Sequence, residues 1–151
     1  SITVCWTSES TTPALSIGIL YKESTDGTYK IAKLALDPDA TRAATNKFTS
    51  VGAAGSACGL TNVYQRTITF ADYGITPALD VLLEMRIRPI YSDTQLAIDA
   101  GATALPLQGN KIESVGSTQG GVTRKVVVYQ QYRASESIFD AGIISQSSFG
   151  H

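Results

Sequence analysis

The segment KIESVGSTQGGVTRKVVVY, from Lys111 to Tyr129, predicts a β-hairpin. A strand-like run, Lys111 to Val115, meets a turn rich in Gly, Ser, Thr and Gln. The chain then continues through a second, strongly β-branched run, Val122 to Tyr129. Alternating side chains on both sides of a glycine-rich turn are typical of two antiparallel strands. The segment therefore predicts a β-rich fold.

The rest of the chain repeats this pattern of short alternating runs separated by turns. Asp26-Gly27 separates two such runs, which is the strongest hairpin signal a single sequence offers. One short helix is expected at 40–46, with Asp39 as its N-cap. We therefore predict an all-β fold: one domain over residues 1–151, an antiparallel β-sandwich of about eight to ten short strands with at most one short helix. The other expected segments are strands at 2–7, 15–21, 29–36, 64–70, 81–90 and 94–100, a loop at 50–59 and a last apolar segment at 137–144.

Composition excludes several classes of protein. With 151 residues, the chain suits one domain that buries roughly two-thirds of its unfolded surface. Charged residues make up 17% of the chain and the net charge is −1, so no nucleic-acid partner is expected. No window approaches the ~18–20 apolar residues of a membrane-spanning helix, so no membrane contact is expected from this segment. Because the chain starts abruptly at a strand-like Ser1, we expect that an upstream segment was removed.

Two cysteines, Cys5 and Cys58, carry the redox information in the sequence. They form no CxxC pair and no Cys/His cluster, so no metal site is expected. Two buried thiols or one disulfide remain, and the even count in a Ser/Thr-rich chain favours the disulfide. Closing a loop of that length stabilises a fold by roughly 3–5 kcal/mol, and such a bond implies an oxidising compartment.

No catalytic set is visible, so we expect neither an enzyme nor a cofactor. The only histidine, His151, is the last residue and gives a nucleophile no base with a fixed position. Asp37 and Asp39 flank a proline in a turn, and turn chemistry is the simpler interpretation; a calcium site there is the alternative. The segment GSTQGG (116–121) lacks the lysine of a phosphate-binding loop and precedes a strand, which favours a hairpin turn.

Aromatic and charged side chains offer two further interpretations. Trp6 shares a strand face with Ile2 and Val4, which favours a core position over a sugar-stacking one. The alternating charged row on strand 81–90 is a solvated face or, alternatively, an inter-subunit ion-pair surface; it comprises Glu84, Arg86 and Arg88. The alternative function is a carbohydrate-binding module with a β-sandwich fold, and its stacking candidates are Trp6, Tyr21, Tyr29, Tyr64, Tyr73 and Tyr91.

Several stretches, in order over most of the chain, carry a resemblance to a known family. They are ITVCW (2–6), PALSIGILYK (13–22), DGTYKIAKLALDP (26–38), NKF (46–48), LLEMRIRPIYSDTQLAI (82–98), LPLQGNKIESVG (105–116), TRKVVV (123–128) and IFD (138–140). Together they resemble the β-rich C-terminal headpiece of PilX-like, type IV pilus-associated (pilin-like) surface proteins of candidate-phyla bacteria. None is a catalytic signature, so the resemblance concerns fold and setting.

The resemblance implies a cell-surface structural subunit of extracellular or pilus location. In that group a hydrophobic N-terminal helix precedes the β domain. These residues hold no such helix, so either they are a soluble ectodomain or the likeness is to the headpiece alone. The segment SESIFDAGIISQ departs from the group's proline-bearing approach to IFD, which leaves the end of the last strand open. The implied partners are other pilin-like subunits, an envelope anchor, or a ligand on a host or neighbouring cell. The group supplies no catalytic residues, and a disulfide between Cys5 and Cys58 would suit a surface subunit.

Overall fold

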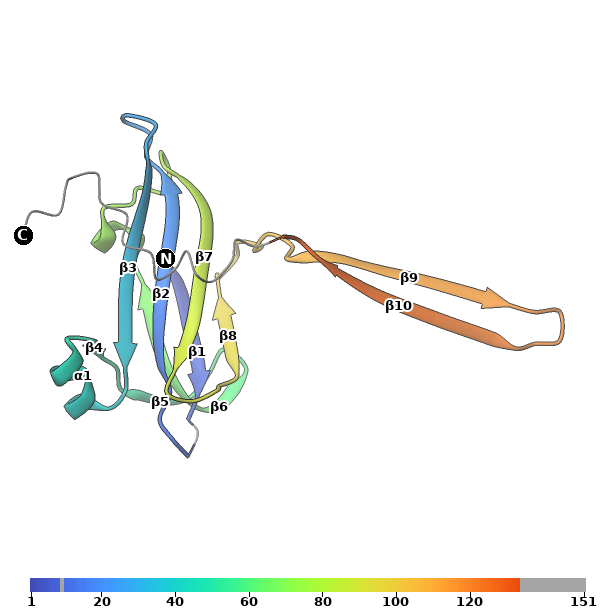
Figure 1. Cartoon of the computed structure of the whole chain (residues 1–151), viewed down its shortest axis with the longest axis horizontal. Coiled ribbons are helices and arrows are strands. Elements are labelled where there is room, and N and C mark those ends of the chain that lie inside the picture. The colour runs from blue at the N-terminus through green and yellow to red at the C-terminus, as the bar shows by residue number, and fades with distance from the viewer. Residues whose placement is uncertain (9, 134–151) are drawn as a thin grey trace, which may run out of the picture. The chain divides into compact units, whose positions relative to one another are not determined.

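The computed structural model describes residues 1–8 and 10–133, and strands dominate them (Figure 1). These residues form ten strands, one short α-helix and one 3-10 turn. The chain divides into two compact units, one of residues 1–104 and one that begins at Leu105. The apolar segment at 137–144 and His151 lie outside the described residues. The single domain expected over residues 1–151 stays a prediction.

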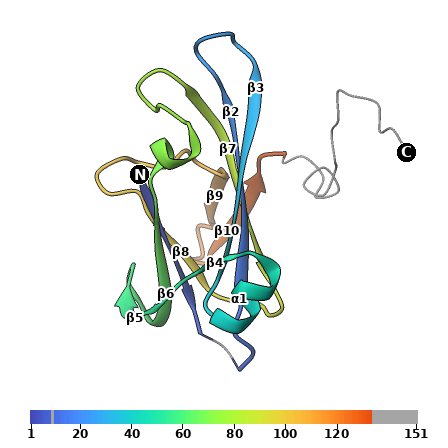
Figure 2. The same ribbon diagram turned by 90° about the vertical axis from the view of Figure 1, so that its left-hand side faces the viewer.

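The first unit contains two four-stranded sheets packed face to face (Figure 1, Figure 2). In order, one sheet holds β5 (Ala53–Ala57), β6 (Leu60–Ile68), β1 (Ile2–Thr7) and β8 (Leu96–Asp99). The other holds β4 (Thr49–Ser50), β3 (Tyr29–Asp37), β2 (Ala14–Lys22) and β7 (Val81–Ile90). Every pairing is antiparallel except that of β3 with β4. The predicted antiparallel β-sandwich is therefore confirmed, with one short parallel pair added to it.

The core lies between the sheets, and the period-two pattern of the strands builds it. Val4 and Trp6 of β1 meet Ile17 of β2 and Ile68 of β6, and all four are at most 1% exposed. The indole Nε1 of Trp6 donates a 3.0 Å hydrogen bond to the carbonyl of Pro13, which satisfies its only polar atom. The predicted core position of Trp6 is confirmed.

Local turn and cap chemistry places most element ends where the sequence predicts them. Helix α1 spans Ala40–Asn46, and the carboxylate of Asp39 accepts the backbone N–H groups of Thr41 and Arg42 as its N-cap. Gly27 adopts a φ of +69° in the turn between β2 and β3, a conformation that glycine takes without strain. Pro89 lies in β7, an edge strand, where a missing ladder donor is tolerated.

Two element boundaries between residues 49 and 73 differ from the sequence prediction. The predicted loop at 50–59 is wrong, because β4 ends at Ser50, β5 lies within the predicted loop and β6 begins at Leu60. A run of Ala, Gly and Ser shows no apolar alternation, so β5 owes its formation to pairing with β6. Beyond Ile68 the expected strand gives way to the 3-10 turn η1 (Phe70–Tyr73).

Cys5 and Cys58 form a disulfide, as predicted. Cys5 is fully buried on β1 and faces Gln65 across the ladder, whereas Cys58 lies in the β5–β6 turn. A flat hairpin would hold these two residues roughly 20 Å apart. Their Cα atoms are 6.2 Å apart, because the hairpin bends at Asn62 (φ +52°) and at the register shift beside Gly55. The disulfide thus pins a bent, small-residue hairpin to the central strand of its sheet.

Removing this bond should destabilise the first unit substantially. With a sequence separation of 53 between the two cysteines, the chain-entropy treatment gives a loss of about 4 kcal/mol for the Cys5→Ala/Cys58→Ala variant. Urea unfolding followed by tryptophan fluorescence measures the loss, since Trp6 is adjacent to Cys5. Reductant should lower the wild-type midpoint and leave that of the variant unchanged. Equal stability of wild type and variant would contradict the assignment.

Candidate functional site

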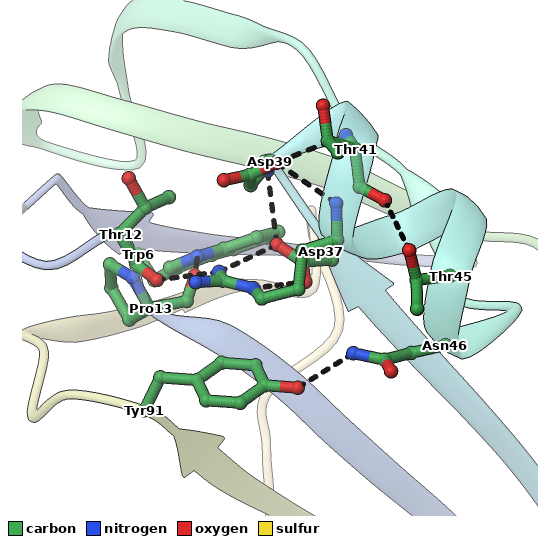
Figure 3. Close-up of polar contacts among 10 residues, drawn as sticks. Trp6, Thr12, Pro13, Asp37, Asp39, Thr41, Thr45, Asn46 and Tyr91 are labelled. Carbon is green, nitrogen blue, oxygen red and sulfur yellow. Dashed lines mark hydrogen bonds and ion pairs between the residues drawn. The ribbon is translucent and has the colours of Figure 1, made fainter.

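Asp37, the last residue of β3, forms an ion pair with Arg42 of α1, and Figure 3 shows the polar contacts around Asp37. The Arg42 guanidinium donates from Nε to Oδ2 at 2.7 Å and from Nη2 to Oδ1 at 2.8 Å, and the Asp37 side chain is fully buried. Arg42 also donates to the carbonyl of Thr12 at 2.7 Å. Pairing with Asp37 raises the pKa of Arg42 above its ordinary value. This forked contact joins the end of β3, the first turn of α1 and the segment entering β2.

Tyr91 covers the other side of the guanidinium. Its ring centroid lies 4.1 Å from Cζ of Arg42, and its hydroxyl accepts a 2.9 Å hydrogen bond from Asn46. Tyr91 has a φ of +76°, which a bulky side chain rarely adopts, so these two contacts hold a strained backbone after β7. Neither partner was predicted; an arginine three residues after an N-cap aspartate carries no distinctive signal.

This geometry argues against a calcium site at Asp37 and Asp39, because both carboxylates already accept hydrogen bonds from the protein. Both Asp37 oxygens accept from Arg42, and the Asp39 carboxylate caps α1. Backbone N–H groups of Arg42 and Thr41 lower the pKa of Asp39. Over residues 1–8 and 10–133, no group of three or more His, Cys, Asp or Glu could hold a metal ion. The two carboxylates therefore serve the fold.

The stacking candidates of the carbohydrate hypothesis do not form one platform. Trp6 and Tyr21 are buried, and the ring of Tyr64 packs beside that of Trp6 with centroids 5.8 Å apart. Tyr29 and Tyr91 are exposed, but the β2–β3 and β2–β7 registers place them at opposite ends of their sheet. Tyr73 lies partly buried against the core. These residues thus lack the joint exposed surface that stacking on a sugar requires.

The remaining polar features do not converge either. A shallow hollow of about 430 Å³ carries one titratable side chain, Asp93; its lining is Ser10, Ser92, Asp93, Thr94 and Gln95. In the outer row of β7, Arg86 donates to Glu84 at 2.6 Å, while Arg88 is exposed. Residues 118–122 close a hairpin turn, with Thr118 N–H donating to the Val122 carbonyl at 3.0 Å. The predicted hairpin turn is confirmed.

The second unit holds the most unusual surface of the described chain. Among the described residues, strands β9 (Gly109–Ser117) and β10 (Thr123–Gln131) pair only with each other, as the long ribbon in Figure 1 shows. Every residue of β10 and all of β9 after Gly109 are exposed. A lone two-stranded hairpin is marginally stable in water, and a row of unpaired backbone groups is a template for another strand.

The two faces of this hairpin differ in chemistry. Directly opposed residues share a face, so Ile112, Ser114, Val126 and Val128 form what we call the apolar face. Its three apolar members are 50% to 59% exposed, far more than strand residues that pack on a core. The sequence predicted the hairpin; the uninterrupted Val126–Val128 run was the signal that both of its faces carry apolar side chains.

The opposite face, which we call the charged face, is internally paired. Glu113 contacts Lys111 and, across the ladder, Lys125 at 2.8 Å. Hydrogen bonds from these two lysines lower the pKa of Glu113, and the contribution of Lys111 is the larger. Val115, Val127 and Tyr129 lie on the same face. Two lysines against one carboxylate leave a net positive charge on the charged face, which suits solvent, so the apolar face and the strand edges remain for a partner.

No family model, curated protein or solved structure matches this chain. The kinship with pilin-like headpieces therefore stays a hypothesis that rests on the residues themselves. No helix among the described residues is long and apolar enough to span a membrane.

The Asp37–Arg42 pair should contribute measurably to stability. Arg42→Ala leaves a fully buried carboxylate unpaired and should lower the free energy of unfolding by about 3 kcal/mol. Arg88→Ala is the matched control, since Arg88 is exposed on β7 and its loss should change stability by less than about 0.5 kcal/mol. Urea titrations of both variants give the comparison. Similar small losses in the two would show that the pair is dispensable.

Proposed function

We propose that this chain is a pilin-like structural subunit of an extracellular cell-surface assembly. It acts through subunit contacts or adhesion made by the β9–β10 hairpin. The observation that carries this proposal is the exposure of a complete hairpin, with an apolar face and two edges that no other described strand pairs with. Strand addition to such an edge supplies affinity through main-chain hydrogen bonds and specificity through alternate side chains.

Two further observations support the extracellular setting. The Cys5–Cys58 disulfide fastens a hairpin of small residues that has little apolar area of its own. Such bonds persist in oxidising compartments and are rare where thiols are kept reduced. The ordered stretches that resemble pilin-like headpieces agree with this setting, and they name the expected partners: other pilin-like subunits or an envelope anchor.

The proposal is tested in cells that carry the gene, by shearing off their surface structures and probing the released fraction for the chain. Val126→Glu places a charge on the apolar face and should reduce the released share at least about tenfold, since burying an unpaired charge costs more than about 1.4 kcal/mol. Val115→Glu is the matched control, because Val115 is equally exposed but lies on the charged face opposite Lys125.

Thiol trapping in the same cells gives an independent readout. Cys5 and Cys58 should resist alkylation until reductant is added. A chain found inside the cell with two reactive thiols, or Val126→Glu and Val115→Glu released equally, would overturn the proposal.

A further inference from the structure

The free edge of β10 has a defined hydrogen-bonding parity. Thr118 N–H donates to the Val122 carbonyl at one end of the ladder, and Tyr132 N–H donates to the Gln108 carbonyl at the other, both at 3.0 Å. Both hydrogen bonds join even-numbered residues that are directly opposite each other in the same register. The alternation between hydrogen-bonded and non-hydrogen-bonded pairs therefore continues without a shift along the whole ladder. Even-numbered residues of β10 therefore bond to β9. Odd-numbered residues point their N–H and C=O groups outward.

Within the part of the chain that the structure describes, five residues of β10 thus present unpaired backbone groups along its outer edge: Thr123, Lys125, Val127, Tyr129 and Gln131. Val127 is both the middle residue of the nine-residue strand and one of these outward residues. A two-fold axis beside Val127 would therefore bring all five in register with the same five of another copy. No residue of β10 is a proline, so every outward donor is present.

This register also satisfies the side chains. Val127 meets Val127 of the second copy, and Val126 meets Val128, so the apolar faces join into one continuous apolar row. Lys125 comes to lie opposite Tyr129, an aromatic ring suited to a cation, and Arg124 lies opposite Gln130. Because β10 carries no acidic residue and only these two basic ones, no like charges oppose each other.

The other edge of the hairpin does not allow the same symmetry. The outward residues of β9 are centred on Glu113, so a two-fold pairing of β9 would place two carboxylates directly opposite each other. Like charges in that position are destabilising. In the sandwich, edge strand β7 lacks a donor at Pro89. The uninterrupted and charge-compatible edge is that of β10.

We propose that β10 pairs antiparallel with β10 of a second copy of this chain, centred on Val127, to form a four-stranded sheet in the order β9-β10-β10-β9. The inference rests on the proposed function, for which it names the partner and the contact. A nine-residue edge covers less area than the roughly 800 Å² per partner of a standard interface, so the dimer is weak and concentration-dependent.

Cysteine cross-linking tests the register. In this pairing the two Val127 Cα atoms lie ~5.5 Å apart, within disulfide range. Val127→Cys under mild oxidation should therefore form a linked dimer at least about tenfold faster than Val115→Cys, because thiols held together react at an effective concentration of order millimolar. Peptide mapping confirms that the introduced thiols are joined and that Cys5–Cys58 is intact. Equal cross-linking rates would overturn the proposal.

Proline substitution tests the edge itself. Val127→Pro removes an outward N–H of β10, and Val115→Pro removes an outward N–H of β9, while both leave the β9–β10 bonds in place. Sedimentation over a concentration series should show self-association for the wild type and Val115→Pro, and monomers for Val127→Pro. Loss of association in both variants would mean that β9 takes part, and would overturn the two-fold pairing.

The two proposals fail in different ways. Suppose the wild type stays monomeric at millimolar concentration while Val126→Glu is still lost from the sheared surface fraction. That outcome would remove the second copy as partner. The role as a surface subunit would then stand, with another protein on the hairpin. If Val127→Cys cross-links as expected in a chain retained inside the cell, the pairing stands and the surface role falls.

Discussion

A β-strand needs a partner for its backbone and a partner for its apolar face, and this constraint governs both units of the chain. In the first unit the two sheets cover each other's apolar faces, and Trp6 and Ile17 are buried between them. The edges are managed separately. Pro89 interrupts β7, and β5 is short and built of small residues. In the hairpin, β9 and β10 pair with each other, but within the described residues neither their outer edges nor their apolar face has a partner.

The sandwich depends on the Cys5–Cys58 disulfide and the Asp37–Arg42 ion pair because its short elements bury little apolar area. The disulfide secures the β5–β6 hairpin, where Ala, Gly and Ser supply almost no hydrophobic stabilisation. At one end of the other sheet, Arg42 holds the seven-residue helix α1 to Asp37 and to the carbonyl of Thr12. A helix of that length is unstable alone. The disulfide and the ion pair thus both stabilise segments whose local propensity alone would not fix their conformation.

The sequence predicted those features that local chemistry decides. Period-two alternation located β1, β2, β3 and β7, and Asp39 located the start of α1. It did not predict β5, because a strand of Ala, Gly and Ser exists only through pairing with β6. Nor did it predict that Arg42 and Tyr91 enclose Asp37, since these residues meet only when separate elements come together. The disulfide was one of two options until the bend at Asn62 brought the cysteines together.

The hairpin that first indicated a β fold is also the least self-sufficient part of the described chain. Its turn and its paired charges specify one conformation, yet its apolar face remains about half exposed. A sequence under no demand to bind could replace Val126 and Val128 with polar β-formers at no loss of pairing to β9. Keeping apolar side chains there exposes the chain to unspecific aggregation, a liability that native edges normally blunt with charge or proline. Such a surface is consistent with selection for a partner strand, and a second β10 in the proposed register would satisfy every outward backbone group of β10 at once.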